Sequence, residues 1–171
     1  MAPTSDRRKV ALAWSSGKDS AYCLHILRQT EDVEVVGLLT TVNAAFDRVA
    51  MHGVRRTLVE AQADAAGLRL TVAEIPHPCP NTAYQEVMGR TVAAARERGV
   101  EAVAFGDLAL ENVRSYREEM MMGSGLKALF PLWGRPTAAL ARVEMPDDWS
   151  NLGPGCAQLV NVTLPKSLRG N

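Results

Sequence analysis

The sequence carries no excess charge of either sign and holds few cysteines and few aromatic residues. Lys plus Arg and Asp plus Glu both number 19 in 171 residues, so no overall positive field favours a nucleic-acid partner. Three cysteines, Cys23, Cys79 and Cys156, lie far apart, and none belongs to a C-x-x-C pair. This number and spacing argue against a disulfide scaffold and against a zinc knuckle.

Long apolar runs are also missing. The first run, residues 10–14, is too short for the core of a signal peptide and far too short to span a membrane. We therefore expect a cytoplasmic protein without a membrane partner. A composition of 47% hydrophobic and 22% charged residues is ordinary for a globular protein, and the length suits one domain with its own core.

Apolar patterns of strand type and of helix type alternate along the chain, at intervals typical of βαβ units. Strands are predicted at 9–14, 33–42, 68–75, 100–106 and 128–133, and helices at 19–28, 54–68, 84–99, 113–122 and from 136 to about 142. The second helix is predicted to bury Val54, Leu58, Ala61, Ala65 and Leu68. Residues 43–51 are predicted to form a loop. The fold class that follows is α/β, a doubly wound, mostly parallel five-stranded sheet with helices on both faces, Rossmann-like.

Two parts of the chain differ in pattern. Residues 1–142 carry the alternation and are predicted to form the α/β domain. Residues 143–171 have little periodicity and are predicted to be a separate tail of unknown role, in which residues 158–164 can add an edge strand.

The stretch S-S-G-K-D-S, residues 15–20, follows the first predicted strand directly. Ligands of open α/β sheets bind at the carboxyl ends of strands, and a helix N-terminus with small preceding residues offers backbone N–H groups to an anion. Lys18 adds a cation, and Asp19 can reach a phosphate-bound magnesium ion or cap the helix. A phosphate-binding loop and a plain helix cap both remain open. The stretch is not a Walker A loop, because Asp19 follows the lysine and Leu12 stands at the first glycine position.

S-S-G-K-D-S resembles the PP-loop, S-G-G-x-D-S, of the ATP pyrophosphatases, with Ser16 in place of the motif's first glycine. Residues 50–68 resemble the histidine-led helix of one branch, the diphthine–ammonia ligase-like proteins. Residues 105–135 resemble that branch's G-D motif, its R-x-x-x-E helix and its P-L-W segment. The resemblance covers residues 9–142, with three motifs in the same order as in the family.

The resemblance implies an enzyme that adenylates a carboxylate with ATP and Mg²⁺, releases pyrophosphate, and lets ammonia displace AMP to give an amide. Its partners would be ATP or AMP, ammonia and an acceptor carboxylate that the sequence does not identify. The implied nucleotide contacts are Ser15, Ser16, Gly17, Lys18, Asp19, Ser20, His52, Gly106 and Asp107. The implied catalytic residues are Lys18, Asp19, Asp107 and Glu118, with Asp19 and Asp107 reaching Mg²⁺ through the phosphates.

Each of these residues also has a structural interpretation. Gly106 and Asp107 can form an ordinary turn, and His52 can cap or pack at a helix start. The charges around Glu118, the better match to the family acid with Glu119 second, are typical of a solvated helix face. Trp133 can line the site or belong to the core.

The chain departs from the family after residue 142. The family continues into a half with a G-E-x-G-E-like motif that selects the acceptor, whereas this sequence has no Gly-Glu dipeptide. Two alternatives to the ligase therefore stay open. One is a nucleotide-binding sensor or partner protein without turnover. The other, less favoured for lack of paired catalytic cysteines and of a basic surface, is a tRNA-modifying PP-loop enzyme. A homo-oligomer is compatible with all three.

Overall fold

The computed structural model describes residues 7–135, 140–144 and 158–163, and the chain divides into two compact units, Met1–Trp133 and Gly134–Asn171. The elements of the first unit are β1 (Arg8–Ala13), α1 (Lys18–Arg28), β2 (Val33–Asn43), β3 (Arg48–Val49), α2 (Arg56–Ala66), β4 (Leu70–Ile75), α3 (Asn81–Glu97), β5 (Ala102–Ala104), α4 (Glu111–Met121) and β6 (Lys127–Leu129). The second unit contains β7 (Leu140–Glu144) and β8 (Gln158–Thr163), which pair antiparallel with each other.

The sheet of the first unit confirms the predicted doubly wound class. β1 pairs in parallel with β2 and β5, β2 with β4, and β5 with β6. Because Leu38 and Leu39 pair with β1 and β4 at once, β4 lies on the other edge of β2, and the parallel order is β4-β2-β1-β5-β6. The chain therefore moves outward in opposite directions from β1 and from β5. A crevice is expected where this reversal occurs, at the carboxyl ends of β1 and β5.

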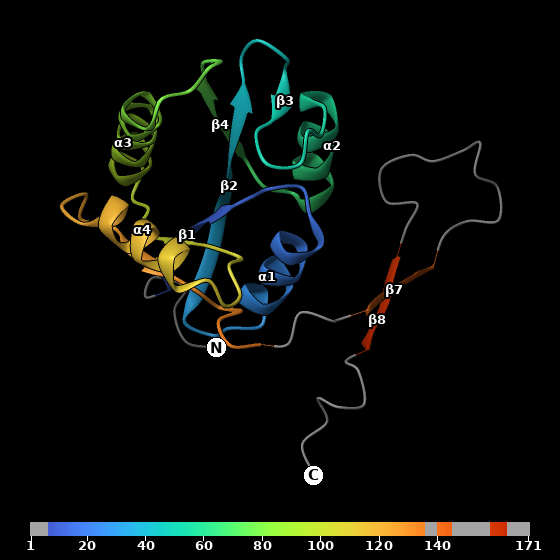
Figure 1. Cartoon of the computed structure of the whole chain (residues 1–171). Helices are drawn as coiled ribbons and strands as arrows, with labels where there is room; N and C mark the ends of the chain where they lie inside the picture. Colours follow the sequence, from blue (N-terminus) through green and yellow to red (C-terminus); the bar gives the residue numbers. More distant parts are fainter. Residues whose placement is uncertain (1–6, 136–139, 145–157, 164–171) are drawn as a thin grey trace. The chain divides into compact units, whose positions relative to one another are not determined.

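Helices cover both faces of this sheet. Figure 1 shows α1 and α2 on one side and α3 and α4 on the other. Successive residues of β1 point to opposite faces, as in any strand. Val10 and Leu12 are fully buried in the cluster formed with α1 and α2, whereas Ala11 joins the cluster formed with α3 and α4. Residues 10–14 of the first predicted strand are therefore all apolar because both faces of the strand are covered.

The predicted buried stripe of the second helix is shifted by one position inside the helix, whereas Val54 and Leu68 at its two ends do pack against the core. The helix begins at Arg56, and Val54 lies outside it, where its carbonyl accepts a hydrogen bond from the Val49 N–H. Val59 and Ala63 are the buried residues of α2, while Leu58 is 52% exposed. Both stripes are apolar in this alanine-rich segment, so sequence periodicity did not distinguish them.

Two further predictions are corrected. Residues 43–51 are not entirely loop, since β3 pairs antiparallel with the end of β2 and makes a sixth strand. The helix predicted from Pro136 to Arg142 is wrong over residues 140–142, which belong to β7; residues 136–139 lie outside the described residues. Residues 158–163 do form a strand, but it pairs with β7 rather than with an edge of the main sheet. This pairing outweighs the helical signal of a proline followed by alanines.

Cys23, at the centre of α1, is fully buried in the core cluster against α2 and β1. Burial, and secondarily the charge of Asp107, raises the pKa of its thiol from 9.0 to about 12. The folded protein therefore keeps the thiol proton that the unfolded chain loses above pH 9. Stability that is fully present below pH 9 is lost as the pH rises toward 12.

We expect Cys23 to remove about 2 kcal/mol of stability between pH 8 and pH 10.5, and the Cys23→Ala variant to lack this loss. Urea unfolding of both proteins across that pH range measures the effect. The variant is less stable at pH 8 because it loses buried volume, and the gap should shrink as the pH rises. Parallel stability curves for the two proteins would contradict the assignment.

Candidate functional site

The chain between β1 and α1 turns sharply at Ser16, whose φ of 65° is in the left-handed region. Gly17 is the N-cap residue of α1 and provides no side-chain cap. Within the described residues, the N–H groups of Lys18, Asp19 and Ser20 donate no hydrogen bond to backbone or side chain. The plain-cap interpretation is therefore not supported by a capping contact. These donors, at the positive end of the helix dipole, are free for an anion.

Serine hydroxyls hold this loop together from the inside. Ser20 is 3% exposed, and its hydroxyl donates to the Gly17 carbonyl at 2.8 Å. Ser15 donates in turn to the Ser20 Oγ at 3.4 Å. Lys18 lies outside, 66% exposed, with its Nζ 2.6 Å from Asp19 Oδ1. Buried Ser20 and half-buried Ser15 shape the loop, and the lysine stays at its solvent side.

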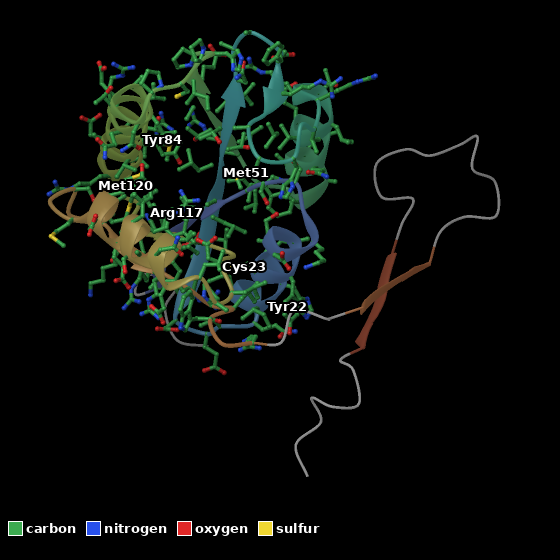
Figure 2. The ribbon with its side chains drawn as sticks, viewed as in Figure 1. Tyr22, Cys23, Met51, Tyr84, Arg117 and Met120 are labelled. Atoms are coloured by element: carbon green, nitrogen blue, oxygen red, sulfur yellow. The ribbon has the colours of Figure 1, made fainter. Side chains whose placement is uncertain are left out.

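A cavity of about 200 Å³ lies beside this loop, at the carboxyl ends of β1, β2 and β5. Figure 2 labels three of its lining residues, Met51, Tyr84 and Arg117, which come from three separate segments of the chain. The described residues that line it are Ala13, Trp14, Ser15, Asp19, Ser20, Leu39, Thr40, Thr41, Val49, Met51, His52, Tyr84, Met88, Phe105, Gly106, Asp107 and Arg117. Six of the ten predicted site residues, Ser15, Asp19, Ser20, His52, Gly106 and Asp107, are thus brought to one cavity.

Gly106 crosses directly in front of the α1 N-terminus. A Cβ built on it would lie 3.3 Å from the backbone carbonyl carbon and oxygen of Asp19 and 3.4 Å from the Ser20 nitrogen. Such distances are tighter than ordinary van der Waals contact, so a side chain here would require the α1 backbone to shift by a few tenths of an ångström. The glycine therefore lets the segment after β5 and the loop of residues 15–20 lie side by side in the wall of the cavity. A glycine in an ordinary turn would not need to approach another part of the chain so closely.

His52 reaches the same loop from the other side. A Cβ on Gly17 would lie 3.2 Å from His52 Nε2, so the ring lies against the loop backbone. The segment that carries His52 is fixed by the Arg48 guanidinium, which donates to the Gly53 carbonyl at 2.7 Å. His52 therefore does not cap α2, whose N-cap residue is Arg55.

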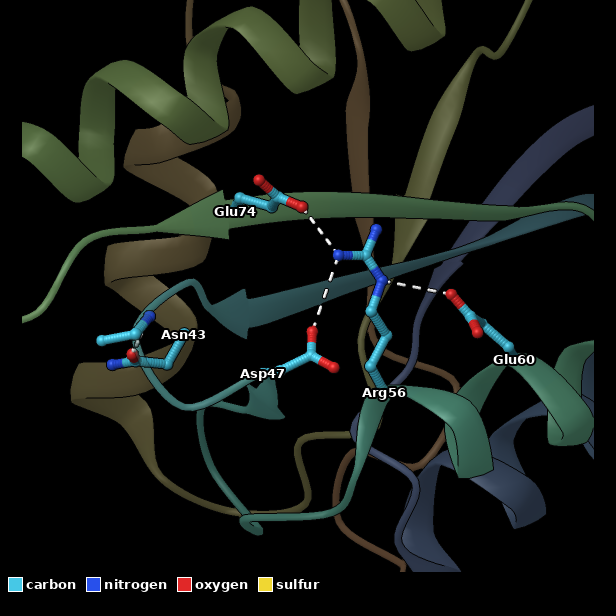
Figure 3. A network of polar contacts seen from close by, with 6 residues as sticks. Asn43, Asp47, Arg56, Glu60 and Glu74 are labelled. Carbon is cyan, nitrogen blue, oxygen red and sulfur yellow. Dashed lines mark hydrogen bonds and ion pairs between the residues drawn. The ribbon is translucent and has the colours of Figure 1, made fainter.

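An arginine network anchors this segment to the sheet. Figure 3 shows Arg56, the first residue of α2, between three carboxylates. Its guanidinium lies 2.7 Å from Glu74 on β4, 3.1 Å from Glu60 and 3.7 Å from Asp47. The hydrogen bond to Glu74, followed by the one to Glu60, raises the pKa of Arg56. Through Asp47 and α2 the network holds both ends of the turn that places Met51 and His52 over the cavity.

Another wall holds a charged pair formed by the predicted site residue Asp107 and by Arg117 of α4, a pairing that the sequence did not indicate. Asp107 Oδ2 and Arg117 Nε are buried atoms 3.6 Å apart, an ion pair without a hydrogen bond. Arg117 donates to the Tyr84 hydroxyl at 3.3 Å, and its Cζ lies 4.9 Å from the centre of the Phe105 ring. A guanidinium stacked on an aromatic face and bonded at one edge is preorganised. This wall therefore presents a carboxylate and a fixed cation to the cavity.

Glu118 does not belong to this group. Its carboxylate accepts from Arg114 Nε at 2.9 Å, and it is absent from the described residues that line the cavity. Arg114 itself lies over two rings, 5.1 Å from the centre of Phe130 and 4.8 Å from that of Trp133. Trp133 thus contacts α4 rather than the cavity.

Ser16 is the position where the motif's glycine is replaced. Besides its positive φ, its hydroxyl is buried and makes no hydrogen bond within the described residues. Left-handed backbone costs a non-glycine residue about 1–2 kcal/mol. A glycine at this position would avoid that backbone cost. It would in turn lose about 0.5–1 kcal/mol of stability because glycine has greater conformational freedom in the unfolded chain.

We therefore expect Ser16→Gly to stabilise the nucleotide-free protein by about 1 kcal/mol, because the buried hydroxyl is also removed. Thermal and urea unfolding measure this. Ser15→Gly is the matched control: Ser15 does not have a positive φ, and its loss removes the bond to Ser20, so this variant should be less stable than the parent. A destabilised Ser16→Gly would overturn the strain argument.

The described residues contain no group of three or more His, Cys, Asp or Glu side chains that could hold a metal ion by themselves. Among the described helices, none has the length and apolar character needed to cross a membrane.

Comparison with known proteins identifies the family of this chain. The chain matches the diphthamide synthase N-terminal domain over residues 8–128. A crystal structure described as a predicted subunit of tRNA methyltransferase from Methanocaldococcus jannaschii is similar at a TM-score of 0.48 and 16% identity, over 92% of this chain and 98% of that one. No curated protein matches the sequence significantly. With its loop, glycine crossing and cavity in place, the chain belongs to the diphthamide synthase N-terminal domain family, within the PP-loop ATP pyrophosphatases.

Proposed function

We propose that the chain binds Mg·ATP in the cavity beside residues 15–20 and adenylates a carboxylate for amide formation with ammonia. The observation that carries the ATP site is the row of free N–H groups at Lys18, Asp19 and Ser20, which faces the Gly106 crossing. Three converging donors at a helix N-terminus suit a phosphate chain. The apolar residues Leu39, Val49 and Met51, which also line the cavity, suit a base.

The carboxylates present fit a magnesium ion held through phosphates. Asp19 and Asp107 both line the cavity, and Asp107 Oδ2 is buried without a hydrogen-bond partner within the described chain. The nearest cation to this oxygen is Arg117 Nε at 3.6 Å, beyond hydrogen-bond distance, so the oxygen keeps its capacity to meet a further cation or hydroxyl. Magnesium, when bound, would neutralise charge on the phosphate oxygens.

In the proposed reaction an oxygen of the acceptor carboxylate attacks the α-phosphorus, the bond to the bridging oxygen breaks, and pyrophosphate leaves. Ammonia then attacks the acyl carbon, a proton is lost from nitrogen, and AMP leaves with the bond electrons. The chain's contribution is to bind the departing pyrophosphate at residues 15–20. Arg117, fixed by Tyr84 and Phe105, supplies the cation on the wall where the acceptor would enter.

The position of Glu118 supports a second candidate. The acid predicted to be catalytic is paired with Arg114 outside the cavity. A protein that binds adenine nucleotide without turnover, as a sensor or a partner of another subunit, needs no such acid.

Pyrophosphate release separates the two candidates. We expect release that requires Mg·ATP, ammonium and one member of a carboxylate panel, and that Asp19→Asn weakens Mg·ATP binding at least tenfold with little change in melting temperature. Asp64→Asn, an exposed aspartate of α2 that does not line the cavity, is the control. Binding of ATP without pyrophosphate for any acid would favour the non-catalytic candidate. Absence of ATP binding would overturn both.

A further inference from the structure

A second cavity, of about 160 Å³, lies on the α3 side of the sheet. It is lined by Ala11, Val36, Gly37, Leu38, Leu39, Arg69, Thr71, Ala95, Arg98 and Val100. Leu39 is the single residue of the described chain that lines both this cavity and the first. The second cavity is therefore a separate site, and Leu39 is the one lining residue that it shares with the nucleotide proposal.

An irregularity in the sheet creates this cavity. Val10 pairs with Val35 and the next residue, Ala11, pairs with Gly37, so Val36 is an extra residue in β2. The backbone of Gly37 approaches β4 so closely that a Cβ would lie 3.1 Å from the Arg69 carbonyl oxygen. Bulges with a glycine of this kind are often found beside binding sites. Here the small side chains of Ala11 and Ala95 leave the space above the bulge unfilled.

Two arginines border this apolar space. Arg69 precedes β4 and Arg98 is the C-cap residue of α3, and the side chains of both are without an ion pair or hydrogen bond among the described residues. Elsewhere in the same unit, Arg56, Arg90 and Arg114 each hold a carboxylate at 3.1 Å or less. Both are exposed residues at the border of the cavity, and an unpaired guanidinium favours the carboxylate of a ligand as its partner.

We propose that this cavity binds an organic acid with an apolar body of about six carbon atoms, whose carboxylate is held by Arg69 and Arg98. An apolar cavity of about 150 Å³ is known to hold benzene, which sets the size of the body. Planar guanidinium groups match the geometry of a carboxylate. The eight other lining residues are apolar apart from Thr71, so an ionic group away from the arginines would be left without partners.

Benzoate is the probe that tests this, because it joins a benzene-sized ring to one carboxylate. We expect saturable one-to-one binding by calorimetry of the full chain, weakened about tenfold in Arg69→Gln and in Arg98→Gln. Benzamide, its neutral analogue, should bind at least tenfold more weakly. Arg90→Gln, a change to another arginine on α3, should leave the affinity unchanged. No saturable heat, or equal binding of benzamide, would overturn the proposal.

The location is tested separately. Benzoate could enter the first cavity as an acceptor, in which case Arg117→Gln would weaken it and the Arg69 and Arg98 variants would not. This outcome would overturn the second site without touching the proposed ligase. Ala95→Leu should fill the second cavity and abolish binding. Nuclear Overhauser effects between benzoate ring protons and the methyls of Val36 and Val100 give the same answer in the unmodified protein, and their absence would contradict it.

Discussion

Gly106→Val is expected to lower the affinity for Mg·ATP by about 100-fold. The added side chain would start 3.3 Å from the Asp19 carbonyl, and backbone rather than a flexible side chain is what it meets. The α1 N-terminus and the end of β5 must then move apart by several tenths of an ångström or more. The free N–H groups of residues 18–20 would lose the geometry in which they converge, so binding is affected more than folding.

Calorimetry with Mg·ATP and urea unfolding, run on the same preparations, measure the two effects. We expect a stability loss of about 1–3 kcal/mol from overpacking. Gly89→Val is the matched control, because a Cβ on this exposed α3 glycine meets nothing within 4 Å. Its stability should change by less than about 0.5 kcal/mol and its ATP affinity not at all. If the Gly106→Val variant binds ATP as tightly as the parent, the close approach of Gly106 to Asp19 and Ser20 does not contribute to a nucleotide site.

The part of the site formed by residues 15–20, Gly106 and Asp107 could be predicted from the sequence, whereas the part formed by Tyr84 and Arg117 could not. Residues 15–20 and Gly106–Asp107 each follow an apolar run, and parallel strands end at a common edge, so their approach follows from topology alone. Thr40 and Thr41, at the end of the next predicted strand, could have been found by the same rule.

Tyr84 and Arg117 carried no such signal. Both lie on helices, and which face of a helix meets the sheet depends on its phase, which helices with few large apolar residues leave ambiguous. The same ambiguity shifted the buried face of α2 from Leu58 to Val59. On α4 the sequence led us to select Glu118 as the site residue. In the structure its neighbour Arg117 lines the cavity, whereas Glu118 accepts a hydrogen bond from Arg114.

The match to the family ends at residue 128, yet the core of the first unit continues beyond it. Leu132 is fully buried, in the cluster that also holds residues of β1, α1 and α2. It follows β6 and fixes a short segment whose Phe130 and Trp133 rings pack on Arg114 of α4. A chain cut after residue 128 would therefore lack part of its own core.

Leu132→Ala is accordingly expected to cost about 3 kcal/mol of stability, as removal of a fully buried leucine usually does. Urea unfolding followed by tryptophan fluorescence measures the loss. Leu110→Ala, at a leucine that is 64% exposed, deletes the same atoms at the surface and should cost less than about 0.5 kcal/mol. Equal losses in the two variants would mean that residues beyond 128 only rest on the domain. A loss confined to Leu132 would show that the segment beyond residue 128 completes the core formed with β1, α1 and α2.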